Sequence, residues 1–360
     1  MKYPVLPKKY WIQHDYLLYA YDILGDMLRQ ADDKKLSNII LKFKNKNQGT
    51  SFNKSEDKLL WMDKNGYHDV AVKMFSNHMF FSLLRDFCYY IYESISCAGR
   101  GKVTVAYTLL RKPMRDNLLY LEWVLADRQE FFDTFLYKEI KYYDISNYKV
   151  FSKDRIQNII DEASKKSYMG KALNYNNLVY TFRFNSEEQI GLQRIWNQSM
   201  HLVTKSPNYE TQQGNLNFVF ADAKVWNDFW DYYYFVMPQL MAYVLEICEA
   251  LFITTIDVNE VELKFNRAIR LAKYANAQIE LKSLQEIKDY TFDLFKMFED
   301  SKIHLSFKCE KCCKDIVFSS KIIDEMIKNQ FIFCPTCNQE HNICKYYTDF
   351  QYIQKTDIKR

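Results

Sequence analysis

Apolar residues recur along most of the chain at the spacing of buried helix faces. Between Val103 and Leu125 they are three or four residues apart, which is the spacing of one face of an α-helix. Pro113 lies inside this run, so we expect the helix to be kinked or split there, because proline lacks an amide donor and clashes with the preceding turn. Similar patterns predict helices at residues 67–96, 153–165, 187–201, 222–252 and 259–275.

The composition agrees with a small number of long elements. Hydrophobic residues make up 48% of the 360 residues, whereas the chain has only 8 glycines and 6 prolines. A chain of many short strands would need a turn signal about every 8–12 residues. We therefore expect a mainly α fold, a helical bundle with a small β-rich region at its C-terminal end.

The helix expected at 187–201 is preceded by the sequence of a capping box. Ser186 is followed three residues later by Gln189. In a capping box each of these side chains accepts a hydrogen bond from the backbone amide of the other residue. We therefore expect this helix to begin at Glu187 and to run to His201.

The run from Tyr232 to Phe252 is long and apolar enough to raise the question of a membrane span. It contains Glu246 and Glu249, and a carboxylate at the centre of a bilayer would cost about 2.5–3.5 kcal/mol. A buried helix of a soluble protein is the expected role, without membrane contact. Charged residues from Lys8 to Asp15 interrupt any apolar core of a signal peptide, so a cytoplasmic location is also expected.

The pattern changes after about residue 300. Short runs of β-branched and aromatic residues at 303–307, 316–318 and 331–333 alternate with cysteine pairs. Ser320 can cap a short helix that runs to about Lys328. We expect a helical domain over residues 1–300, followed by a zinc ribbon over residues 301–360.

Four cysteines in this region have the spacing of a metal site. Cys309 and Cys312 form one C-x-x-C pair, and Cys334 and Cys337 form a second. Each pair can place two thiolates on one tight turn, and two such turns complete the tetrahedron that zinc prefers. Because four thiolates leave no open coordination position, we predict one structural zinc ion per chain.

Other interpretations of these cysteines remain open. Two redox pairs are the alternative to a metal site, and Cys313, His341 and Cys344 are near enough in sequence to replace a ligand. The role of the ribbon is open as well. The net charge of +4 is too small to identify a partner, so RNA or another nucleic acid and a protein partner are both considered.

Two groups of polar residues interrupt the apolar helices. Arg111, Arg115 and Glu122 would lie within about 40° of one another on an unbroken helix. Arg194 and His201 are seven residues apart, nearly two turns, and would also face the same way. The first group could instead be a buried ion-pair network, and a histidine at a helix end often only contacts the last carbonyl groups.

An arginine and a histidine on one helix face are the minimum for RNA cleavage without a metal. The imidazole can move a proton at the 2′-hydroxyl or the leaving oxygen, and the guanidinium can bind the charged phosphate. The segment from Arg194 to His201 resembles the R-x4–6-H signature of the HEPN superfamily, a group of all-helical RNA-binding and RNA-cleaving domains. The resemblance covers about residues 67–252. Where the family usually has a polar residue after the arginine, this chain has Ile195, and Asn197 is the nearest polar substitute.

The resemblance implies a metal-independent endoribonuclease of bacterial antiviral defence or of a toxin system. His201 would be the general acid and base, and Arg194 the phosphate ligand. Arg111, Arg115 and Glu122 would support the cleft, and two chains would pair their motifs in a homodimer. The alternative is a non-catalytic helical sensor or interaction module with a structural zinc ribbon.

Overall fold

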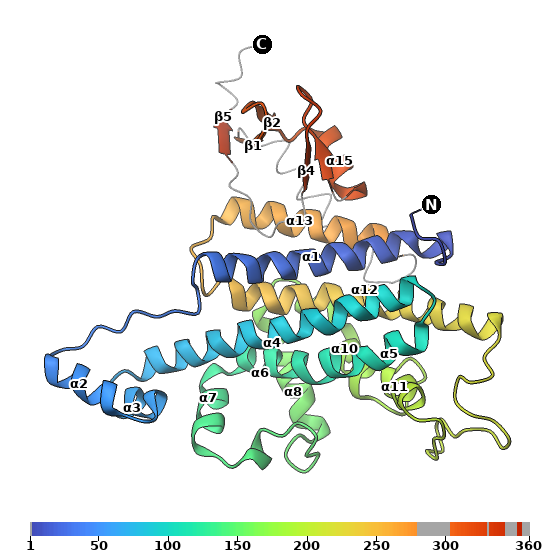
Figure 1. Cartoon of the computed structure of the whole chain (residues 1–360), viewed down its shortest axis with the longest axis horizontal. Coiled ribbons are helices and arrows are strands. Elements are labelled where there is room, and N and C mark those ends of the chain that lie inside the picture. Colours follow the sequence, from blue (N-terminus) through green and yellow to red (C-terminus); the bar gives the residue numbers. More distant parts are fainter. Residues whose placement is uncertain (1, 279–302, 330, 343–350, 355–360) are drawn as a thin grey trace.

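The computed structural model describes residues 2–278, 303–329, 331–342 and 351–354 (Figure 1). It confirms a mainly helical protein with a small C-terminal β region. Short 3-10 turns lie between some of the helices. The helices are α1 (Trp11–Asp33), α2 (Lys46–Lys54), α3 (Lys58–Lys64), α4 (His68–Gly99), α5 (Val103–Arg111), α6 (Leu118–Ala126), α7 (Arg128–Tyr137), α8 (Lys153–Lys166), α9 (Gly170–Leu173), α10 (Leu178–Phe184), α11 (Leu192–Met200), α12 (Ala223–Phe252) and α13 (Glu260–Ala277).

Four long helices form the body of the protein. In Figure 1, α13, α1, α12 and α4 lie alongside one another, and α1 contacts each of the other three. The shorter helices α5 to α11 lie on the side of α4 and α12 that is remote from α13. At the N-terminal end of α4, the helices α2 and α3 pack around a small separate cluster that includes Trp61, Met62 and Tyr67.

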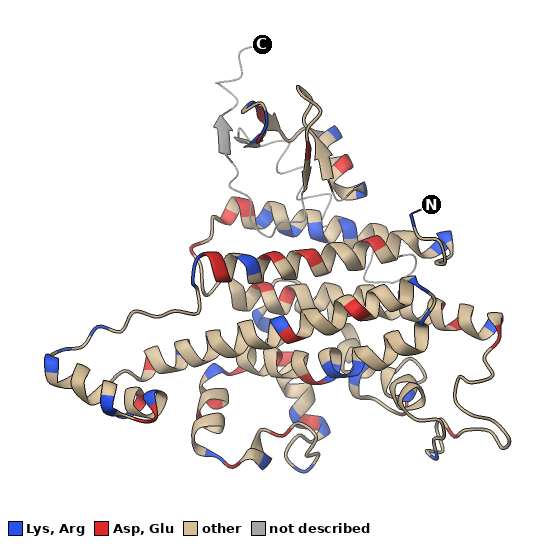
Figure 2. Cartoon of the chain, viewed as in Figure 1, with Lys and Arg blue, Asp and Glu red and all other residues tan. Residues whose placement is uncertain are grey.

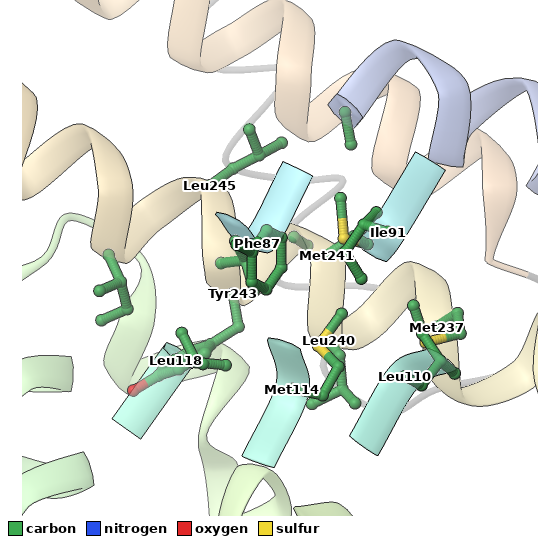
Figure 3. Packing of buried hydrophobic residues seen from close by; sticks show 14 of the residues in the cluster. Phe87, Ile91, Leu110, Met114, Leu118, Met237, Leu240, Met241, Tyr243 and Leu245 are labelled. Carbon is green, nitrogen blue, oxygen red and sulfur yellow. The ribbon is translucent and has the colours of Figure 1, made fainter. Parts of the chain in front are cut away.

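Helix α12 is the centre of the main core. Every residue from Val236 to Phe252 is buried, which is the pattern of a helix that is covered on all sides. Figure 3 shows Leu110 and Met114 beside Met237 and Leu240 of α12. Among the described helices, α12 alone has the length and apolar composition of a membrane span, but 94% of that apolar window is buried inside the protein.

The long apolar run from Val103 is split, as its proline predicts. A π-helical segment, Lys112–Asn117, separates α5 from α6 and contains Pro113. Proline removes one amide donor from the helix, and a π turn is one of the ways in which a helix absorbs such an interruption. The apolar positions on both sides of the break still enter one core.

The predicted start of the helix at Glu187 was wrong, because α11 begins five residues later. Asn185 accepts a hydrogen bond from the amide of Glu187 at 3.0 Å, and the amide of Gly191 donates to Glu188 at 3.0 Å. These local bonds form a turn that competes with a helix. The turn is tight, since a Cβ on Gly191 would lie 2.3 Å from the carbonyl oxygen of Asn185. The helix also ends one residue early, at Met200.

The C-terminal region contains two small antiparallel sheets. The first has the strand order β2 (Asp315–Val317), β1 (Ile303–Lys308), β5 (Gln351–Gln354), and the second pairs β3 (Phe331–Phe333) with β4 (Glu340–Asn342). The helix α15 (Ser320–Lys328) lies between β2 and β3 in the chain. Its N-cap residue is Ser319, one residue before the predicted Ser320. The predicted domain boundary at residue 300 lies outside the described residues.

The ribbon packs directly on α13. Phe265 of α13 stacks on Phe318 with 4.9 Å between ring centroids. The Lys273 ammonium donates to the carbonyls of Ile327 at 3.2 Å and Asn329 at 2.6 Å, and so it satisfies acceptors at the end of α15. Leu271 of the same helix belongs to the main core. Helix α13 therefore has one side in the body and another in the ribbon.

Candidate metal centre and predicted catalytic residues

The two C-x-x-C turns bring their four sulfur atoms together. All four ligand atoms lie within 4.8 Å of one another, with 3.5 Å between Cys309 and Cys337 and 3.7 Å between Cys312 and Cys334. Zinc–sulfur bonds of about 2.3 Å in a tetrahedron require sulfur atoms about 3.8 Å apart. The group therefore fits one metal ion, and the all-thiolate donor set points to zinc.

The two turns have the same backbone geometry. The amide of Cys309 donates to the carbonyl of Lys314 at 2.9 Å, and the amide of Cys334 donates to Gln339 at 2.8 Å. The residue after each pair, Cys313 and Asn338, has the same left-handed backbone with φ of 56°. Such a residue reverses the chain, so that both cysteines of a pair face the same point. Cys313 is exposed and lies outside the group of four ligands.

The backbone around two of the sulfurs favours the thiolate form. Burial opposes ionisation of Cys334, but the backbone amides of Cys337 and Thr336 donate toward its sulfur and lower its pKa to about 6. Burial likewise opposes ionisation of Cys309, and the amides of Cys312 and Lys311 outweigh it and lower the pKa of that thiol. Backbone amides also donate toward Cys312 and Cys337, but burial and the neighbouring sulfurs of the same group outweigh them and raise the pKa values of these two thiols. Each turn therefore holds one sulfur that favours the thiolate, which is the form that binds zinc.

His341 supports the metal centre from outside the group of ligands. It is buried on β4, and its Nε2 lies 3.3 Å from Sγ of Cys309. Its ring packs edge-on against Phe307 with 5.2 Å between centroids. A hydrogen bond from a neighbouring side chain orients a ligand and tunes its charge. Of the other candidate ligands, Cys344 lies outside the described residues.

Arg194 and His201 both lie on the surface. Arg194 is exposed in the first turn of α11, and His201 is exposed directly after the last helical residue, in extended backbone. In the described part of the chain neither side chain takes part in a hydrogen bond or an ion pair. Asn197 is half-buried, and its amide donates to the Tyr209 hydroxyl at 2.8 Å.

The packing of α11 explains the apolar residue after Arg194. Ile195 and Trp196 are buried and hold the helix against the body. Helix α11 lies against α5, and the Thr108 hydroxyl donates to the carbonyl of Ser199 at 3.3 Å. The two elements that carry the predicted polar groups are therefore neighbours.

The three residues Arg111, Arg115 and Glu122 do not form one polar face. Arg111 and Arg115 are half-buried, and Arg115 pairs with Asp116 at 3.1 Å. Glu122 is completely buried and pairs at 2.6 Å with Arg183, which is also completely buried. Arg111 precedes the π segment, Arg115 lies within it and Glu122 follows it, so the 100° spacing of a continuous α-helix does not apply.

Arg183 is a central polar residue that the helical periodicity did not identify. Its Nε donates to the carbonyl of Met114 at 2.5 Å, in the π segment, while Nη1 binds Glu122. The pKa of Glu122 is raised, because burial disfavours its charge more than Arg183 favours it. In the sequence, the feature that could have identified Arg183 is its position as the single charged residue within the apolar run from Leu178 to Phe184.

A second buried ionic group joins α12 to α13. Glu249 binds Arg267 and Arg270 of α13. Glu246, one turn earlier, accepts a hydrogen bond from the amide of Met169 at 2.7 Å. Burial, with Glu249 nearby, raises the pKa of Glu246 to about 7. The carboxylates that argued against a membrane span thus connect the central helix to its neighbours.

Comparison with protein-family models, with curated proteins and with solved structures finds no match for this chain.

Proposed function

We propose that this protein is a non-catalytic interaction module, in which the zinc ribbon presents a binding surface and the helical body holds it in place. The observation that supports this most is the closed group of four thiolates within 4.8 Å. A catalytic zinc site keeps one position open for water or substrate, whereas four protein thiolates leave none. The ion would therefore hold the fold of the ribbon.

The exposed side of β3 is the surface that suits a partner. Phe331 and Phe333 are 37% and 43% exposed, while Ile332 between them is buried. The two rings lie edge to face with 5.6 Å between centroids. Exposed aromatic side chains are typical of the centres of protein interfaces, where they contribute large contact areas.

The charges of the ribbon favour a protein partner over a nucleic acid. Residues 303–342 contain five lysines and five carboxylates, so their formal charges cancel. Figure 2 shows basic and acidic residues mixed on both the ribbon and the body, so that charges of one sign are not gathered in one region. Binding to a phosphate backbone depends on a clustered excess of positive charge.

The partner surface is tested with the double variant Phe331→Ser, Phe333→Ser. We expect wild-type protein, cross-linked in cells, to capture a defined partner that the double variant loses at least tenfold by quantitative mass spectrometry. Zinc content and melting temperature should stay the same, because both rings are partly exposed. Capture of the same partners by the variant would contradict the proposal that this surface binds them. Tyr148→Ser, at an exposed residue of the body, is the matched control.

A second candidate function is a ribonuclease formed by two chains. It is supported by the exposure of Arg194 on α11, which packs against α5, and of His201 directly after that helix. Apolar residues surround His201: Met200, Leu202 and Val203 are 43%, 60% and 53% exposed. A second copy could cover this surface and complete a HEPN-like site, with RNA as the substrate.

RNA cleavage separates the two candidates. We expect zinc-loaded protein to leave single-stranded and hairpin RNA intact over hours, and the variants Arg194→Ala and His201→Ala to behave as wild type. Cleavage by wild type that falls at least a hundredfold in both variants, at unchanged zinc content and melting temperature, would instead establish the ribonuclease. Lys205→Ala, at an exposed residue of the same loop, is the control for loss of charge.

A further inference from the structure

An open groove of about 610 Å³ lies where α1 ends and α4 begins. Its walls come from the segment that follows α1, from the beginning of α4, and from Thr255, which follows α12. Figure 1 shows the end of α1, the start of α4 and the end of α12 at the same end of the body. Sites for small ligands measure about 300–1,000 Å³, so this groove has the size of a binding site.

One polar side chain in the wall is almost completely buried and has no partner. Asn77 lines the groove from α4 and is only 4% exposed. Its side-chain amide forms no hydrogen bond in the described part of the chain, and neither polar atom of that amide is closed off from solvent. The small accessible part of this side chain is therefore its amide, which faces the groove. A buried amide without a protein partner is costly, and a bound molecule can supply the missing hydrogen bonds.

Three lysines give the groove its charge. Lys34 and Lys35 follow α1, and Lys73 lies one turn before Asn77 on α4. Lys35 and Lys73 are exposed and form no ion pair in the described part of the chain. Asp69 is the one carboxylate among the described residues of the wall, so the groove has an excess of two positive charges. A phosphate monoester has a charge of about −1.5 to −2 at neutral pH, which matches this excess.

Carboxylates on the last turn of α1 do not cancel the charge of the lysines. Asp32 pairs with Arg85 at 2.9 Å, and Asp33 pairs with Arg29 at 2.8 Å. Each of these carboxylates already has an arginine as its counter-ion. The excess positive charge of the groove is therefore available to an anion from outside the protein.

Apolar side chains form another part of the wall. Ile39 and Ile40 come from the segment after α1, and Val70 comes from α4. Ile40 is 88% exposed, so a bound molecule could cover it. An inorganic phosphate ion would leave this apolar surface in water, whereas a ligand with a carbon skeleton would bury part of it.

We propose that this groove binds a small organic phosphate, a phosphate monoester on a short hydroxylated carbon skeleton. Lysine ammonium groups bind phosphate as point charges. The Asn77 amide offers donors and an acceptor, and the Asp69 carboxylate accepts a hydrogen bond from a hydroxyl group of the skeleton. The proposal is independent of the ribbon surface, because no described residue of the ribbon lines this groove.

The test is calorimetric titration of zinc-loaded full-length protein with glycerol 3-phosphate, ribose 5-phosphate and glucose 6-phosphate. The unphosphorylated parents and inorganic phosphate are titrated alongside. We expect at least one ester to bind at one site per chain, and its parent and inorganic phosphate to bind at least tenfold more weakly. The double variant Lys35→Met, Lys73→Met should also bind at least tenfold more weakly. Asn77→Leu should lose at least fivefold in affinity without a fall in melting temperature, because its amide has no protein partner.

The matched control is Lys138→Met, at an exposed lysine outside the groove, which should bind as wild type does. The proposal is overturned if none of the three esters binds at millimolar concentration, which would leave a groove filled by solvent only. Unchanged affinity of the double lysine variant also overturns it. Sedimentation with phosphatidylcholine vesicles that contain phosphatidate tests a lipid source of the phosphate. Binding to these vesicles, without binding of any soluble ester, would overturn the assignment to a small soluble molecule.

Discussion

Removal of zinc is expected to unfold the ribbon and to leave the helical body folded. Cys309 and Cys334 belong to the ribbon core together with Ile316 and Ile332, and this core is separate from the main one. Structural zinc contributes about 10–16 kcal/mol to the folding of isolated zinc-finger peptides, more than so small a core can replace. Helix α13 should loosen on its ribbon side, because Phe265 loses the Phe318 ring.

Hydrogen exchange with and without a chelator measures this effect. Amides in residues 303–342 should lose their protection, while those of α4 and α12 keep theirs. Cys334→Ser should bind at most a small fraction of one zinc per chain, whereas Cys313→Ser should keep one, since Cys313 is exposed and outside the group of ligands. Full protection of the metal-free ribbon would refute a structural role for the ion.

The replacement Arg183→Met is expected to lower the free energy of unfolding by about 3–5 kcal/mol. Arg183 and Glu122 are both completely buried, and the change leaves the carboxylate without its cation. It also removes the donor to the Met114 carbonyl in the π segment. Against a typical stability of about 5–15 kcal/mol, such a loss should be visible in any chemical denaturation experiment.

A double-mutant cycle identifies the source of the loss. Adding Glu122→Leu to Arg183→Met removes the unpaired charge, so the double variant should be more stable than Arg183→Met alone. The loss of stability that remains in the double variant measures the lost hydrogen bond from Arg183 to the Met114 carbonyl in the π segment. Lys165→Met breaks the exposed pair with Glu162 and should change nothing measurable. Equal losses in the Arg183 and Lys165 variants would contradict this account.

Helices with a regular spacing of apolar residues in their own sequence were predicted well. The prediction for 153–165 corresponds to Lys153–Lys166, and that for 222–252 to Ala223–Phe252. Asp222, at the predicted start of the second, caps it through the amide of Val225 at 2.9 Å. The helix at 187–201 failed because a turn around Gly191 competed with the capping box, and its tight backbone contact could not be seen in the sequence.

The group of four cysteines was determined by the sequence itself, because one turn of a few residues holds each pair and spacing alone decides whether two sulfurs can face one point. Only the tertiary structure decided the partners of the other polar groups. Glu122 found Arg183, 61 residues away, rather than Arg111 or Arg115 on its predicted face. Glu249 likewise found Arg267 and Arg270 of α13. Such pairs depend on how whole helices pack, and the periodicity of a single helix does not contain that information.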